Sequence, residues 1–212
     1  IGYRLVRLTL VDGPLVGLHS VVRHEIAGHG GRIRQLGGDV RGYEIDLPPP
    51  YGGGGGATSF RLEDAGPEEG AVVVAGGLES AVLDARGLEE RWVARGRMDS
   101  REALRYLYDL LEVRSYIEDA RSPGVREGHD VENYVGLVNA SAPANAPGEP
   151  ITVDALQDAS SVELLNPGFY YALYAVFGRY LVAGERRAPV PALDIGAVRL
   201  MPTLHLRLAP FG

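Results

Sequence analysis

Apolar and polar residues follow two different spacing patterns along this chain of 212 residues, one typical of strands and one typical of helices. Residues 4–14, RLVRLTLVDGP, alternate in a β-like manner and end in an Asp-Gly-Pro turn signal, so they predict a strand. In residues 15–30 the apolar side chains recur at helical spacing instead: Leu15, Leu18, Val22 and Ile26. We therefore expect a strand and then a helix at the start of the chain.

Prolines and glycines interrupt the next part of the chain. Residues 37–56 form a loop-rich tract that ends in PPPYGGGGG, where three prolines make the backbone stiff and five glycines make it flexible. This tract fits either a mobile flap that brings Tyr51 near a cleft or a plain surface loop. The apolar run AVVVAGG, residues 71–77, fits either a short strand or the lead-in to a helix.

Helical patterns dominate the following segments. Residues 78–96 place their apolar side chains at helical spacing and stop at Gly96. Residues 99–120 carry the strongest helical pattern, with Asp99 or Ser100 as the cap. Its apolar side comprises Leu104, Leu107, Leu111 and Ile117.

Two more helical segments and a strand-like tail complete the pattern. Residues 128–139 predict a short helix, and residues 166–181 predict another that begins with Asn166 as cap and a proline in its first turn. The tail alternates, with Leu204, Leu206 and Leu208 on one side, as a strand would. The whole inventory predicts an α+β protein that is mainly helical, with a few short strands.

The composition narrows the class of protein. Hydrophobic residues make up 45% of the chain, which suits a globular core, and the net charge of −7 argues against a nucleic-acid partner. All 21 basic residues are arginines, and they mark no single site. Because the chain has no cysteine, thiolate metal sites are excluded, and any metal ion must be held by His, Asp or Glu.

The length suits a single domain over residues 1–212, with an alternative division into a metal-site half, residues 1–140, and an extension, residues 151–212. Because the chain starts at Ile1 rather than at Met, we expect a piece of a longer or processed protein. The compartment stays open, with the periplasm or a membrane surface favoured over the cytoplasm.

The most apolar run is FYYALYAVFGRYLVAG, residues 169–184. It is interrupted by Arg179 and is too short for a clean membrane span, so it predicts a buried core helix. The alternative is a docking helix that associates with a membrane or a protein complex through Phe169 to Leu181.

The stretch HEIAGHGG, residues 24–31, carries the chemistry that stands out. His24 and His29 are five residues apart, and in a regular helix this spacing turns the two side chains apart by about 140°. One extra residue absorbed as a π-bulge near Gly28 restores the alignment, and glycine accommodates such a distortion. The spacing therefore predicts a metal site only if the helix is locally widened.

The stretch resembles the H-E-x-x-G-H-G motif of the dipeptidyl peptidase III class of zinc metallopeptidases, over about seven residues. The resemblance implies zinc as cofactor, His24 and His29 as metal ligands, and Glu25 as the general base. It also implies a zincin-like helical core and a peptide or protein substrate. The second motif of that class has no clear copy in this chain.

A catalytic zinc site needs a third protein ligand. Zinc peptidases of the glutamate-ligand type place it on a helix after the histidine motif, so by this resemblance we expect Glu79, with Asp84 orienting a ligand histidine. Otherwise Glu79 is an acid at a helix N-terminus that interacts with the helix dipole.

The segment GHDVENY, residues 128–134, offers groups that stabilise an oxyanion. His129 and Tyr134 are the expected catalytic donors, and Asp130 is placed to steer a neighbouring ring. The competing interpretation of this segment is a helix N-terminus with Asp130 as its cap.

The sequence thus favours a zinc-dependent hydrolase, most simply a metallopeptidase, that uses metal-activated water and a glutamate base. The alternative is a non-catalytic structural or interaction subunit of a larger complex. The sequence does not name the substrate.

Overall fold

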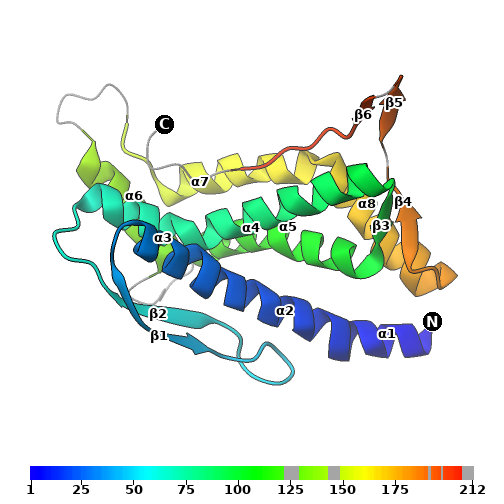
Figure 1. The fold of residues 1–212 in the computed structure, drawn as a ribbon, viewed down its shortest axis with the longest axis horizontal. Helices are drawn as coiled ribbons and strands as arrows, with labels where there is room; N and C mark the ends of the chain where they lie inside the picture. The colour runs from blue at the N-terminus through cyan, green and yellow to red at the C-terminus, as the bar shows by residue number, and fades with distance from the viewer. Residues whose placement is uncertain (122–128, 143–148, 191, 197, 207–212) are drawn as a thin grey trace.

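The computed structural model describes residues 1–121, 129–142, 149–190, 192–196 and 198–206. Helices run along the length of the molecule, and short two-stranded sheets lie at their flanks (Figure 1). The α+β, mainly helical class expected from the sequence is confirmed.

One continuous helix runs from Gly2 to Gln35. Its α-helical stretches alternate with wider π-helical turns, in the order α1 (Gly2–Arg7), η1 (Leu8–Asp12), α2 (Gly13–Val22), η2 (Arg23–His29) and α3 (Gly30–Gln35). We call this element the first helix. The strand expected over residues 4–14 is therefore wrong.

Pro14 accounts for the first π-helical turn. A proline within a helix lacks the N–H that would bond to the carbonyl four residues back, and its ring pushes that carbonyl away. The helix widens at η1, and the Leu10 carbonyl accepts a hydrogen bond from the Tyr51 hydroxyl at 2.7 Å. The chain thus stays helical through an Asp-Gly-Pro sequence that elsewhere signals a turn.

A hairpin covers one side of the first helix (Figure 1). It consists of the antiparallel strands β1 (Asp39–Ile45) and β2 (Gly56–Arg61), which the sequence analysis missed inside its loop-rich tract. The proline and glycine run forms the hairpin loop. Because Tyr51 is bound to the N-terminal half of the first helix, the surface-loop interpretation of this run fits better than the flap.

Two long helices, α4 (Pro67–Arg95) and α5 (Ser100–Asp119), pack against the first helix. Residues 71–77 belong to α4, so they are the lead-in to a helix. The expected stop and cap are confirmed: Gly96 is left-handed with φ 67°, and the Asp99 side chain accepts a hydrogen bond from the Arg101 amide at 3.0 Å.

The core lies where α4 and α5 meet the later helices. Trp92 and Tyr106 are fully buried, and their ring centroids are 5.0 Å apart. On α5, Leu107 and Ile117 are buried as expected, but Leu111 is 44% exposed. The buried face is rotated so that Asp109 points inward, and this rotation brings acidic side chains towards the first helix.

The later helices are α6 (Asp130–Ser141), α7 (Val153–Ser160), η3 (Ser161–Leu165), α8 (Pro167–Leu173) and η4 (Tyr174–Ala183). Asn166 caps α8 as expected, since its side chain accepts a hydrogen bond from the Gly168 amide at 2.9 Å. The apolar run from residue 169 buries one side against α5 and exposes aromatic side chains on the other.

Short strands complete the fold: β3 (Arg97–Asp99) pairs with β4 (Arg187–Pro189), and β5 (Leu193–Ile195) with β6 (Val198–Leu200). The strand expected in the tail is not formed over residues 201–206, and Leu208 lies outside the described residues. His205 is mostly buried, with Nε2 2.9 Å from a carboxylate oxygen of Glu89.

Candidate metal centre

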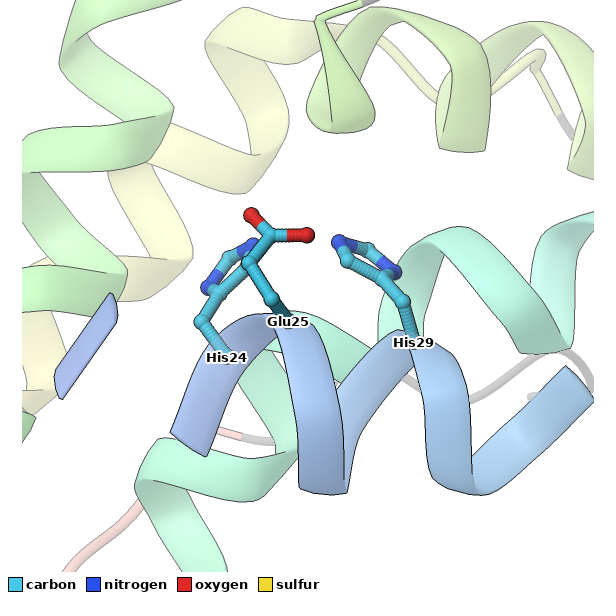
Figure 2. Close-up of side chains that lie close together, drawn as sticks. All are labelled: His24, Glu25 and His29. Carbon is cyan, nitrogen blue, oxygen red and sulfur yellow. The ribbon is translucent and has the colours of Figure 1, made fainter. Parts of the chain in front are cut away.

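The second π-helical turn, η2, brings the two histidines of the motif together. The centroids of the His24 and His29 rings are 4.8 Å apart, and both rings leave the same side of the helix (Figure 2). A regular α-helix would separate them, so the extra residue expected near Gly28 is confirmed. Ligand atoms of His24, Glu25 and His29 all lie within 4.8 Å of one another.

Glycines let this turn press closely against α4. A Cβ at Gly28 would lie 2.6 Å from the Gly76 carbonyl oxygen, and a Cβ at Gly77 would lie 2.3 Å from His24 Nε2. Larger residues at these positions would force the two helices apart or move the imidazole. The pair of glycines in α4 therefore positions the metal motif.

Each imidazole is held from behind through its Nδ1 atom. His24 Nδ1 lies 3.0 Å from the Glu112 carboxylate on α5, and His29 Nδ1 lies 2.8 Å from the Val73 carbonyl oxygen on α4. Such acceptors fix a metal-binding histidine in the tautomer that leaves Nε2 free for the ion. Both rings thus present Nε2 to the same place.

That place is occupied by the carboxylate of Asp130. Its Oδ2 atom lies 3.2 Å from His24 Nε2 and 3.1 Å from His29 Nε2. Asp130 is the first residue of α6, and it is mostly buried. Burial acts to raise the pKa of this carboxyl, but the hydrogen bonds with the two histidines outweigh it and hold that pKa well below its usual range.

The spacing of these three atoms fits a zinc ion. A tetrahedral ion with bonds of about 2.0–2.1 Å keeps its ligand atoms about 3.3–3.4 Å apart. The two nitrogen–oxygen distances of 3.2 and 3.1 Å are close to that edge. Two neutral imidazoles and a carboxylate are also donors that zinc accepts in catalytic sites.

The hydrogen-bonding contacts of the His24 and His29 rings also favour a bound cation. Every ring nitrogen of His24 and His29 faces an oxygen atom that accepts. Without a metal ion, each of the four contacts is a hydrogen bond only if its ring nitrogen carries a proton. Burial lowers the pKa of His24, but hydrogen bonds to Asp130 and Glu112 raise it to about 9. A divalent cation would replace the two inner protons without changing the total charge.

Glu25 lies beside the two imidazoles (Figure 2). It is buried, and one of its carboxylate oxygens accepts a hydrogen bond from the Thr58 hydroxyl of β2 at 2.6 Å. The hairpin therefore orients this carboxylate. Glu25 thus lies close to the two imidazoles and is held through one carboxylate oxygen, an arrangement that is compatible with the role implied by the motif.

Glu79 and Asp84 are placed differently from the sequence expectation. The Glu79 carboxylate accepts a hydrogen bond from Arg32, which follows the motif on α3. Asp84 is paired with Arg105 and lies 3.6 Å from Arg23. The position expected of Glu79 is filled by Asp130, because the N-terminus of α6 reaches the two histidines.

His129 and Tyr134 are also placed away from the expected donor role. The His129 side chain caps α6, since its Nδ1 accepts a hydrogen bond from the Val131 amide at 3.3 Å. Tyr134 is 3% exposed and belongs to an apolar core cluster. The cap is therefore His129 and not Asp130, whose carboxylate contacts the motif.

Tyr116 supplies the phenol in the cluster. Its hydroxyl donates a hydrogen bond to Asp130 Oδ2 at 3.2 Å, and its ring lies 5.4 Å from the His24 ring. Burial and the charge of Asp130 raise the Tyr116 pKa well above its usual value, so the hydroxyl stays protonated as a donor. Tyr116 and Glu112 are four residues apart on α5, a helical spacing that places both on one face.

A buried network of charged side chains contacts the histidine site through Glu112. Arg23, directly before the first histidine, donates hydrogen bonds to Asp109, Glu112 and Ser80. Glu112 thus joins Arg23 to His24. Burial raises the Asp109 pKa to about 8 although Arg23 opposes this shift. A charge cluster of this kind is costly to desolvate, and here its partners are all held on rigid helices.

Comparison of the chain with protein-family models, with curated proteins and with solved structures finds no match.

Proposed function

We propose that this chain is a zinc-dependent hydrolase, most simply a metallopeptidase. His24, His29 and Asp130 would hold the ion, and Glu25 would act as the general base. The observation that carries the proposal is the convergence of two Nε2 atoms on one carboxylate oxygen, with both Nδ1 atoms held by acceptors. The meeting of the histidine-motif helix with a carboxylate from a later helix supports a zincin-like core as part of this proposal.

When bound, zinc would lower the pKa of a water molecule towards about 7 and polarise a carbonyl group of the substrate. Glu25 would accept a proton from the attacking water and would pass it to the leaving group. The Thr58 hydroxyl holds one oxygen of Glu25, which leaves the other oxygen to act as the base. Tyr116, whose hydroxyl donates to Asp130 in the structure, would act as the oxyanion donor by turning that hydroxyl to the substrate.

The substrate class rests on the motif. The resemblance of HEIAGHG to the dipeptidyl peptidase III class supports a peptide or protein substrate for this site. The site departs from the expected glutamate-ligand type, since an aspartate from α6 takes the place of Glu79. In this proposal Asp130 is a zinc ligand and Glu25 is the general base.

Glu25→Gln tests the assignment of the base. The amide keeps its hydrogen bond with Thr58 but cannot accept a proton, so the variant should retain zinc and lose peptide hydrolysis. Glu44→Gln, on an exposed position of the same hairpin, is the matched control and should keep both. The assay is amine release from a mixed peptide library, with zinc content measured on the same samples.

Two results would count against the proposal. Loss of zinc from Glu25→Gln would make Glu25 a ligand and leave the chain without this base. Zinc-replete protein that hydrolyses no peptide would favour the alternative of a non-catalytic interaction subunit.

A further inference from the structure

The N-terminal half of the first helix carries an unusual amount of exposed apolar surface. Within the described residues, the first helix is long and apolar enough to cross a membrane. Only 28% of its most apolar stretch is buried in the protein. Up to Leu15, large apolar side chains are exposed: Ile1, Tyr3, Leu5, Val6, Leu10, Val11 and Leu15. A large uncovered apolar surface of this kind is typical of a site that binds a membrane or another protein.

The helix η4 extends this apolar surface. The side chain of Arg4 donates hydrogen bonds to the carbonyls of Leu181 and Val182, both at 3.0 Å, which joins α1 to the end of η4. Exposed apolar and aromatic side chains follow along α8 and η4: Tyr170, Tyr171, Tyr174, Phe177 and Val182. The two segments together form what we call the apolar platform.

Charged side chains within the platform form hydrogen bonds or ion pairs inside the protein. Arg4 is bound to the two carbonyls of η4, and Arg7 is paired with the buried Asp12 at 3.2 Å. Asp12 is paired on its other side with Arg101 at 3.1 Å. The polar groups of this half of the helix are therefore satisfied inside the molecule, while the apolar side chains face outward.

A pocket on the platform is lined by apolar side chains. It has a volume of about 270 Å³ and lies between the first helix and the hairpin loop. Its lining includes Leu10, Leu15, Leu18 and Leu47. The Tyr51 hydroxyl at its edge is already bound to the Leu10 carbonyl, so the pocket suits a hydrocarbon group.

We infer that the apolar platform docks on a lipid bilayer and that the pocket takes a lipid acyl chain. Beyond Leu15, residues such as Gly17 and Ser20 are buried against the rest of the protein. Within the described residues, the part of the first helix that is open to lipid therefore ends before Gly17, and we place the platform at the membrane surface.

Charge and aromatic side chains favour lipid over a second copy of the chain. Residues 1–15 contain two arginines and one acidic residue, the buried Asp12, whereas the whole chain has a net charge of −7. A cationic segment on an anionic protein matches anionic headgroups, while a symmetric contact would place two cationic helices together. Exposed tyrosines are also the side chains that prefer the membrane interface.

Vesicle flotation tests the inference. The whole chain should float with phosphatidylcholine vesicles, and more strongly when phosphatidylglycerol is added. The variant Leu5→Asp with Leu10→Asp should lower the bound fraction about tenfold or more, because charged side chains enter the interface poorly. The control Leu83→Asp with Leu111→Asp, at exposed leucines of α4 and α5, should float like the wild type.

Other outcomes would overturn the inference. Wild-type protein that stays unbound with both kinds of vesicle would do so, as would equal loss in the two double variants. A dimer in solution that Leu5→Asp with Leu10→Asp dissociates would assign the platform to a second copy. The inference does not rest on the proposed hydrolase, since zinc content should be unchanged in all of these variants.

Discussion

Gly77→Ala should disturb the metal centre although it adds only a methyl group. Gly77 lies inside α4, where alanine is intrinsically better than glycine by about 0.8–1 kcal/mol. Helix propensity alone therefore predicts a more stable protein. The structure predicts the opposite, because the new Cβ would lie 2.3 Å from His24 Nε2.

The size of the effect follows from this contact. Real Cβ atoms essentially never approach another atom closer than 3.0 Å, so the imidazole must retreat by at least about 0.7 Å. Zinc ligation tolerates displacements of about 0.2 Å. We expect zinc affinity to fall on the order of 100-fold, at the upper end of the effect of disturbing a ligand's support, and overpacking to cost about 1–3 kcal/mol.

Gly87→Ala is the matched control. This glycine lies ten residues later in the same helix, and a Cβ there would make an ordinary contact of 3.5 Å with Arg91. Competition with a chelating dye gives the zinc affinity, and urea unfolding of the zinc-free proteins gives stability. Gly87→Ala should stabilise by about 0.5–1 kcal/mol with unchanged zinc affinity. Equal zinc affinity in the two variants would refute the proposed packing of His24 on α4.

Three further predictions concern the ligands, the base and pH. Asp130→Asn should weaken zinc binding about tenfold or more, because an amide is a poorer zinc ligand than a carboxylate. Glu79→Gln should leave zinc binding unchanged. The same dye competition measures the zinc affinity of both variants. Thr58→Val should lower kcat while zinc is retained, because Glu25 loses the hydroxyl that orients it. Kinetics and metal analysis on one sample test this, and an unchanged kcat would contradict it. In the zinc-free chain, burial lowers the His24 pKa but hydrogen bonds to two carboxylates raise it to about 9, above its ordinary 6.5. The stability that the protonated ring contributes is complete below pH 6.5 and is lost as the pH rises to 9, so the urea midpoint should fall across this window. A midpoint that stays level there would show that His24 folds as a neutral ring.

The sequence predicted the local geometry of the motif because spacing within one helix is a local property. The spacing of five positions from His24 to His29 required an extra residue in the turn, and η2 provides it. Caps and stops such as Asp99 and Gly96 were predictable for the same reason, since each depends on its near neighbours.

The third ligand was not predictable in this way. Glu79 and Asp130 each stand near the start of a helical segment in the sequence, and nothing local distinguishes them. Asp130 reaches His24 and His29, which lie 106 and 101 positions earlier in the chain, because α6 packs on α4. Glu112 and Tyr116 were missed because the apolar pattern of their helix was assigned a slightly rotated face.

The first strand was mispredicted because two local signals agreed on the wrong answer. Alternation over residues 4–11 indicated a strand, and Asp-Gly-Pro indicated a turn. In the structure a π-helical turn accommodates Pro14, and Tyr51 binds the neighbouring carbonyl from the distant hairpin loop. A tertiary contact of this kind overrides propensity and is invisible in the local pattern.

Zinc K-edge X-ray absorption on zinc-loaded protein tests the central claim most directly. We predict about one zinc per chain, with nitrogen and oxygen ligands at roughly 2.0–2.1 Å and the scattering of two imidazoles. His24→Ala and His29→Ala should each remove one imidazole or the zinc itself. Wild-type protein that binds no stoichiometric zinc, or imidazole scattering that survives both substitutions unchanged, would contradict the claim that these two histidines share one ion.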